Sequence, residues 1–220
     1  MRLYLDSAVP EEIRRGLETG LFYGVTMNPF LLRNHPLLTS MSFTELVKML
    51  EPLVEKEFHV QVPGNSFEEL VKNALKVHAI NPEKIFIKIP ATPEGFKAIS
   101  LLKKKGVRIT VTAITSPAQA VLAALLGAEY VAPFTTRVYE LGGDGMGLLR
   151  KILHLYRTHG VSTMVIAASI RSVDQVLKAF ALGSHAVTIK YSLLQRLLLS
   201  EQTEEIVKEM NEAWKNIKFE

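Results

Sequence analysis

The 220-residue sequence contains no cysteine and no apolar run of the ~18 residues that a membrane-spanning helix needs. Without cysteine there are no disulfide bonds, thiolate nucleophiles or cysteine-bound metals. Without such a run we expect no transmembrane segment. Residues 1–16 lack an apolar core and reach acidic side chains early, so we also expect no signal peptide. The simplest consistent expectation is a cytoplasmic protein that does not bind a membrane.

The sequence also lacks a large excess of charge of either sign. The formal net charge is +4, from 26 Lys and Arg against 22 Asp and Glu. The densest basic run, 103–105, falls at the end of a predicted helix, where cations interact favourably with the helix dipole. We therefore expect no nucleic-acid partner. The histidines show no metal-ligand spacing, so we expect no metal and no cofactor.

Short apolar runs alternate with longer amphipathic segments along the whole chain. The predicted strands are 2–6, 24–27, 58–62, 85–89, 108–114, 130–134, 163–168 and 185–189. Mostly apolar runs of this kind are typical of strands buried on both faces. Eight strands, each followed by a helix, predict an α/β protein with a (β/α)8 TIM barrel. An open doubly wound sheet would favour a glycine-rich turn after the first strand, and residues 6–10 contain no glycine.

No composition shift marks a domain boundary, so we interpret residues 1–220 as a single barrel domain. Residues 203–217 predict an additional C-terminal helix with an apolar stripe that includes Met210 and Trp214. Eight helices already cover such a barrel, so this apolar stripe is not needed for its core. We expect the stripe to cover the end of the barrel or, as we favour, to pack on a neighbouring subunit. The glycine-rich segment 142–147 is interpreted as a capped loop before a helix that begins at Leu148.

Polar side chains gather at the predicted C-terminal ends of the strands, where barrels of this type carry their chemistry. They are Asp6, Thr26, Asn28, Gln61, Lys88, Thr112, Phe134 to Arg137, Ser169, Arg171 and Lys190.

Lys88 is the most informative of these residues. A lysine inside a barrel loses hydration, which lowers its pKa and exposes a neutral amine able to attack a ketone. Asp6 ends the first strand and could accept a proton from a substrate hydroxyl. The sequence leaves open a structural pairing of Asp6 with Lys88, or Asp6 as a helix N-cap. Lys190 is a rival lysine that we expect to point into solvent.

Arg137, Ser169 and Arg171 follow the sixth and seventh predicted strands. Two guanidinium groups and a hydroxyl suit a phosphate monoester. Surface salt bridges are the alternative interpretation of the two arginines.

Several segments resemble the small-subunit transaldolase family, which includes the fructose 6-phosphate aldolases. The resemblance covers nearly the whole chain, in order and at family spacing. Its segments are LYLDS at 3–7, GVTMNP at 24–29, FIKIPATPEG at 86–95, VTAITSPAQA at 111–120, GAEYVAPFTTRV at 127–138 and AASIR at 167–171.

This resemblance implies a metal-free class I aldolase mechanism. By position, the Schiff-base lysine is Lys88 and the acid/base aspartate is Asp6. The resemblance implies that Thr26 and Asn28 contact the hydroxyl groups of the donor substrate. The resemblance further implies a catalytic water held by Gln61 and Thr112, phosphate binding by Arg137 with Ser169 and Arg171, and Phe134 at the substrate. It implies sugar-phosphate substrates and a homo-oligomer, often a pentamer or decamer.

Two residues of this sequence match different branches of the family. Gln61 matches the fructose 6-phosphate aldolases, whereas transaldolases place glutamate there. Phe134 matches the transaldolases, whereas the aldolases place a tyrosine whose phenol can position water. We favour transaldolase, with dihydroxyacetone transferred to an aldose phosphate in the pentose phosphate pathway, over release of free dihydroxyacetone. Met27 and Lys190 also depart from the family and are expected near the barrel mouth. More distant alternatives are a phosphosugar isomerase and a non-catalytic sugar-phosphate binder.

Overall fold

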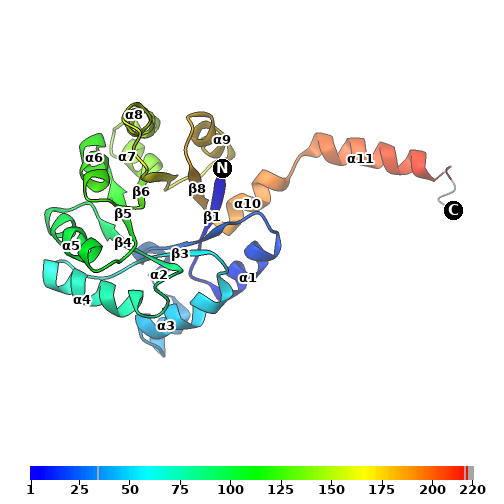
Figure 1. The fold of residues 1–220 in the computed structure, drawn as a ribbon. Helices are drawn as coiled ribbons and strands as arrows, with labels where there is room; N and C mark the ends of the chain where they lie inside the picture. The colour runs from blue at the N-terminus through cyan, green and yellow to red at the C-terminus, as the bar shows by residue number, and fades with distance from the viewer. Residues whose placement is uncertain (34, 216, 218–220) are drawn as a thin grey trace.

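The computed structural model describes residues 1–33, 35–215 and 217, and its described part forms a closed parallel barrel of eight strands (Figure 1). The strands are β1 Arg2–Asp6, β2 Gly24–Met27, β3 Glu57–Gln61, β4 Ile85–Pro90, β5 Ile109–Ile114, β6 Tyr130–Pro133, β7 Met164–Ala167 and β8 Ala186–Ile189. Each strand pairs with its successor, and β1 pairs with β8 to close the ring. The predicted (β/α)8 fold is therefore confirmed.

The helices run between the strands and surround the barrel, except for the last two, which follow the final strand. They are α1 Pro10–Glu18, α2 Pro29–Leu32, α3 Phe43–Leu50, α4 Phe67–His78, α5 Pro93–Lys104, α6 Pro117–Leu125, α7 Thr135–Glu140, α8 Gly145–Thr158, α9 Val173–Ala181, α10 Tyr191–Leu198 and α11 Glu201–Trp214, with 3-10 turns at Pro36–Thr39 and Glu51–Leu53. Serine side chains cap several of them. Ser66 accepts a hydrogen bond from the Glu69 amide and Ser172 from the Gln175 amide.

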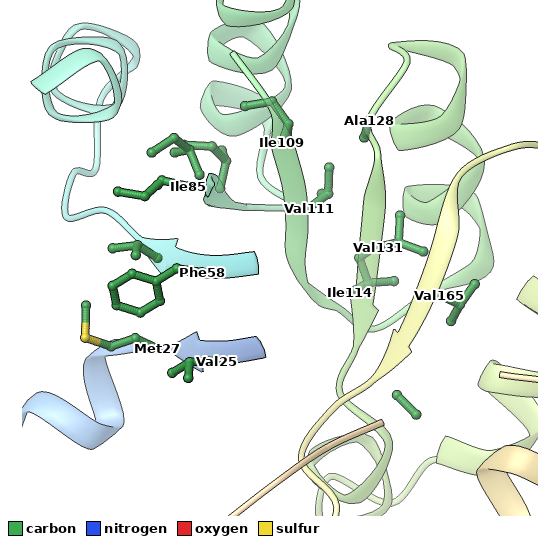
Figure 2. Packing of buried hydrophobic residues seen from close by; sticks show 14 of the residues in the cluster. Val25, Met27, Phe58, Ile85, Ile109, Val111, Ile114, Ala128, Val131 and Val165 are labelled. Atoms are coloured by element: carbon green, nitrogen blue, oxygen red, sulfur yellow. The ribbon is translucent and has the colours of Figure 1, made fainter. Parts of the chain in front are cut away.

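The strand side chains divide between two cores because successive residues of a strand face opposite sides. Val25, Phe58 and Val131 belong to the large core between the barrel and its helices (Figure 2). Met27 also lies there and is fully buried. The prediction that Met27 sits near the barrel mouth is therefore wrong, because Thr26 and Asn28 occupy the alternate side of the strand.

A second, smaller core fills the inside of the barrel below Lys88. Tyr4, Phe86 and Tyr130 belong to it, and His59 stacks on Phe86 with ring centroids 4.7 Å apart. Tyr130 Oη donates to Glu57 at 2.8 Å, while His59 Nε2 lies 3.3 Å from the same carboxylate. These buried side chains form an aromatic floor that fills the barrel on the N-terminal side of the lysine.

The glycine-rich segment 142–147 is a tight helix start. Asp144 accepts a hydrogen bond from the Gly147 amide at 2.8 Å, and α8 begins at Gly145, so the predicted start at Leu148 is wrong. A Cβ built on Gly145 would lie 1.8 Å from the carbonyl oxygen of Thr135. Glycine is needed there because α7 and α8 approach so closely.

Helix α11 extends away from the barrel (Figure 1). It begins at Glu201, two residues before the predicted 203–217 segment, and residue 216 of that segment lies outside the described residues. None of its residues is buried, and Ile206, Met210 and Trp214 are each more than half exposed. No helix in the described part of the chain is long and apolar enough to cross a membrane.

Candidate active site

A cavity of about 710 Å³ opens at the C-terminal ends of the strands. This volume lies within the range of small-molecule sites, roughly 300–1,000 Å³. Most of the predicted site residues line it: Asp6, Asn28, Lys88, Phe134, Arg137, Ser169 and Arg171. The fold thus brings together residues that lie far apart in the chain and that the sequence patterns had singled out.

Lys88 lies at the base of this cavity and is 4% exposed. Burial lowers its pKa, and the carboxylate of Asp6 opposes that shift. Among the described residues no carboxylate lies within 4.0 Å of its amine. The structure therefore does not contain the direct Asp6–Lys88 pair that the sequence left open. A desolvated, unpaired lysine is enriched in its neutral, nucleophilic form.

Asp6 ends β1 and shares the cavity with Lys88. Its carboxylate accepts hydrogen bonds from Thr26 Oγ1 at 2.7 Å and from Asn28 Nδ2 at 3.1 Å. Burial raises the pKa of Asp6, and Lys88 and Lys190 partly offset that rise. Helix α1 has Val9 at its N-cap, so Asp6 is not a cap. A carboxyl group with a raised pKa holds a proton more readily than an ordinary aspartate, which suits a group that takes up and returns a substrate proton.

Thr26, Gln61 and Thr112 do not line the cavity. Thr26 lies behind Asp6, and its hydroxyl is 2.7 Å from that of Thr188. Gln61 is aligned with Lys88 on the adjacent strand, and both point to the inside of the barrel. Thr112, on β5 beside β4, points inward as well.

The hydroxyl of Thr112 is buried and has no hydrogen-bond partner among the described residues. Such a group is costly unless it binds a polar partner. Ala113, directly after it, has a left-handed backbone with φ of 56°, and the β5–β6 register shifts between Thr112 and Ile114. This local irregularity lies beside a predicted site residue, as backbone strain often does.

The two predicted phosphate-binding arginines share one carboxylate. Arg137 Nη1 donates to Glu140 at 3.1 Å, and Arg171 Nη1 donates to the other oxygen of Glu140. Both arginines are exposed and both line the cavity. The salt-bridge interpretation is confirmed, whereas phosphate binding by these arginines stays a prediction. Glu140 was not singled out from the sequence, although it lies one helical turn after Arg137.

Ser169 follows β7, two residues before Arg171. Its φ of 63° is in the left-handed region, which is uncommon for a residue other than glycine. The side chain lines the cavity. Phe134 lies one residue beyond β6, where a single bridge joins it to Ala168, so the predicted strand ended one residue too late.

The cavity mouth also contains residues that the sequence patterns did not identify. They are Phe30, Leu31, Arg33, Thr188, Ser192, Leu193 and Arg196. Lys190 lines the cavity as well, although it is exposed as predicted. Except for Thr188, which lies within β8, these residues follow β2 or β8, and chain that follows a strand forms the mouth of a barrel. That position is the weak sequence signal for them.

This arrangement defines a class of protein. A parallel barrel with a buried lysine and carboxyl group at the base of a cationic cavity has the layout of an enzyme acting on an anionic small molecule. No group of three or more metal-ligating side chains lies together among the described residues.

Comparisons with known proteins identify the family. Residues 3–220 match the family Transaldolase/Fructose-6-phosphate aldolase. The chain is 36% identical over 217 residues to a protein named probable transaldolase from Clostridium kluyveri (strain NBRC 12016), covering 99% of each. It is 34% identical to a probable transaldolase from Thermoplasma volcanium, covering 99% of this chain and 96% of that protein. The chain therefore belongs to this family and is an enzyme of the transaldolase or aldolase type.

Two solved structures show the fold alone. A thiamine phosphate pyrophosphorylase from Pyrococcus furiosus has a TM-score of 0.59 at 21% identity, covering 86% of this chain and 85% of the other. An inosine 5′-monophosphate dehydrogenase from Legionella pneumophila has a TM-score of 0.62 at 12% identity, covering 88% of this chain and 58% of the other.

Proposed function

We propose that the enzyme transfers a dihydroxyacetone unit from a ketose phosphate to an aldose phosphate through a Schiff base on Lys88. The observation that carries this proposal is the buried amine of Lys88 at the base of the cavity, with a lowered pKa and no carboxylate in contact. A neutral amine can attack the ketone carbon, whereas a charged ammonium group has no free electron pair with which to do so.

The chemistry proceeds in balanced steps. The neutral amine of Lys88 adds to C2 of the ketose, and the carbinolamine takes up a proton at its hydroxyl and loses water to form an iminium ion. The Asp6 carboxylate takes the proton of the C4 hydroxyl while the C3–C4 bond breaks. Its electron pair forms an enamine on Lys88, and an aldose phosphate leaves. The enamine then adds to the aldehyde of a second aldose phosphate, Asp6 returns the proton, and water hydrolyses the new iminium.

The remaining site residues support these steps. Thr26 and Asn28 donate to Asp6 and hold its carboxylate in place. We assign the substrate phosphate to Arg137, Ser169 and Arg171, with Glu140 holding the two guanidinium groups together in the free enzyme. The unpaired hydroxyl of Thr112 supports its role, with Gln61, in holding the water of the carbinolamine steps.

Borohydride trapping tests the Schiff base. Reduction in the presence of fructose 6-phosphate should attach the donor-derived fragment to the peptide that contains Lys88, and peptide mass spectrometry locates it. Lys88→Met should abolish the label. Label on Lys190, or full activity in Lys88→Met, would refute the assignment. A phosphosugar isomerase or a non-catalytic binder would give no label.

Fructose 6-phosphate aldolase activity is the second candidate, and Gln61 is the observation in its favour. The two activities separate when glyceraldehyde 3-phosphate is measured with and without erythrose 4-phosphate. Product only with the acceptor supports transaldolase, whereas product without it supports the aldolase. We expect dependence on the acceptor because Phe134 has no hydroxyl with which to position water.

We also propose a homo-oligomer in which α11 packs on a neighbouring subunit. The support is the exposed apolar stripe on this helix, which includes Ile206, Met210 and Trp214. An extended helix with no buried residue of its own gains stability by covering such a stripe. Static light scattering of the full chain should give a mass of several subunits, and a monomer would contradict this.

A further inference from the structure

A chain of hydrogen bonds runs through the barrel interior on the N-terminal side of Lys88. It begins at Thr110, which is buried and pairs with Lys88 in the register of β4 and β5. The Thr110 hydroxyl lies 2.8 Å from Nδ1 of His59, and Nε2 of His59 lies 3.3 Å from the carboxylate of Glu57. The chemistry proposed above for Lys88 makes no use of these side chains.

His59 is fully buried and is held in place by rings from three neighbouring strands. Its ring stacks on Phe86, which lies two residues before Lys88 on β4, with centroids 4.7 Å apart and an interplanar angle of 15°. It meets Tyr4 of β1 and Tyr130 of β6 edge-on, each with centroids 4.9 Å apart. These contacts fix the direction in which each ring nitrogen points.

The carboxylate of Glu57 sets the direction of every donor in this chain. Burial raises the pKa of Glu57, but hydrogen bonds from His59 and Tyr4 outweigh burial and leave that pKa below its ordinary value. An ionised carboxylate only accepts hydrogen bonds, so Nε2 of His59 carries a proton. Burial lowers the pKa of His59, so the ring is neutral and Nδ1 has a free electron pair. The Thr110 hydroxyl therefore donates to Nδ1.

The other titratable groups around His59 leave this direction in place. Tyr4 and Tyr130 stay protonated because burial raises the pKa of each phenol, and both donate to the Glu57 carboxylate. Arg2, at the start of β1, lies 3.4 Å from the same carboxylate. All these groups stabilise the ionised form of Glu57, so its contact with His59 keeps the same polarity.

This polarity has a consequence at Lys88. Because the proton of the Thr110 hydroxyl points to His59, the negative end of the hydrogen-bond chain is the oxygen of Thr110, beside the strand that carries the lysine. Asp6 is the carboxylate that favours the charged form of Lys88 from β1. The oxygen of Thr110 acts in the same sense from β5, on the other side of β4 from Gln61.

We propose that His59 is a positioning residue for the Schiff base, because it orients the Thr110 hydroxyl with its oxygen toward the nitrogen of Lys88. This inference rests on the proposed function and deepens it. A preoriented partial negative charge favours the iminium ion, in which the lysine nitrogen is positive, over the neutral carbinolamine. In the free enzyme the same charge favours the ammonium form of Lys88 and so opposes the effect of burial.

The pKa of the Lys88 amine tests this polarity without any substrate. Competitive labelling with acetic anhydride across a pH series, followed by peptide mass spectrometry, measures that pKa. His59→Phe keeps an aromatic ring but removes both nitrogens. It should lower the pKa of Lys88 by about one unit, the lower end of what a hydrogen bond to a charged group contributes. A purely structural role would let water reach the amine and raise its pKa toward the ordinary value of about 10.4.

Three further variants complete the test. Thr110→Val removes the hydroxyl, keeps the shape of the side chain and should lower the pKa of Lys88 by a similar amount. His59→Gln supplies an amide group that can donate to Glu57 and a carbonyl oxygen that can accept from Thr110, so it should restore most of the wild-type value. Ile166→Val, a buried change in the same small core but outside the hydrogen-bond chain, is the matched control and should leave the pKa unchanged.

Borohydride trapping gives a second measurement. At saturating fructose 6-phosphate the rate of trapping on Lys88 should fall about tenfold in His59→Phe and Thr110→Val, because less of the enzyme is present as the iminium ion. His59→Gln should recover most of that rate, and Ile166→Val should trap as fast as the wild type.

A Lys88 pKa that is unchanged or raised in either folded variant, His59→Phe or Thr110→Val, overturns the inference. Thr110→Val leaves the contact between His59 and Glu57 intact, so it decides the question if His59→Phe does not fold. Trapping in the wild type, with an unchanged pKa in the variants, removes the role of His59 alone. No trapping in the wild type, with the pKa lowered in both variants, removes the Schiff base and leaves the orientation of Thr110 supported.

Discussion

Replacement of Lys88 by methionine should stabilise the folded protein while it abolishes trapping. The amine is 4% exposed, its pKa is lowered by burial, and no carboxylate among the described residues contacts it. Methionine has a similar length and no charge, and the aromatic floor below it, including Phe86, offers an apolar surface. A buried polar group without a hydrogen-bond partner costs about 1–3 kcal/mol of stability in protein variants, and methionine removes that cost.

One electrostatic effect opposes this increase in stability. Loss of Lys88 removes a cation that lowers the pKa of Asp6. The carboxylate keeps the hydrogen bonds from Thr26 and Asn28, and it can take up a proton because its pKa is already raised. We therefore expect a net increase of about 1–3 kcal/mol in the free energy of unfolding. For a chain of this size each kcal/mol raises Tm by about 2–4 °C.

The pH dependence gives an independent signature. Between the lowered pKa of folded Lys88 and the ordinary lysine value of about 10.4, the unfolded chain binds the proton more strongly. Stability of the wild type should then rise with pH across this window, and Lys88→Met should lose that rise. Urea unfolding at several pH values measures both effects. Lys190→Met is the control, because this lysine is exposed and its removal should change stability by less than about 0.5 kcal/mol. A folded Lys88→Met protein no more stable than wild type would refute the reasoning.

Phe134→Tyr should raise the ratio of free dihydroxyacetone release to transfer, because it restores a hydroxyl at the cavity; an unchanged ratio, measured with and without erythrose 4-phosphate, contradicts this role. Gly145→Ala should lower the free energy of unfolding by about 1–3 kcal/mol, because its Cβ would lie 1.8 Å from the Thr135 oxygen, and an unaltered urea midpoint would count against that contact. Removal of residues 201–220 should reduce the mass in light scattering but preserve the circular dichroism of the barrel, because no α11 residue is buried; an unreduced mass would exclude α11 from the interface.

The strands and their polar ends could be predicted because they depend on local patterns. A short apolar run ending in Asp6 or containing Lys88 is visible in the sequence, and the bounds of β1 and β2 match the prediction. The start of α8 was placed at Leu148, three residues too late, because the true start at Gly145 depends on the close approach of α7, a tertiary contact. The position of Met27 was mistaken because only the paired strands show which side of β2 faces the cavity.

The amino-acid sequence alone determined the barrel, the family resemblance, and a lysine and an aspartate at strand ends. The tertiary structure decided how these groups interact. Pairing of β1 with β2 brings Asp6 to Thr26, and closure of the ring through β1 and β8 brings it near Lys190, without a direct contact to Lys88. The folded chain also joins Arg137 and Arg171 through Glu140. Periodicity reports the side on which a residue lies, whereas charge partners depend on distances between segments that only the folded chain brings together.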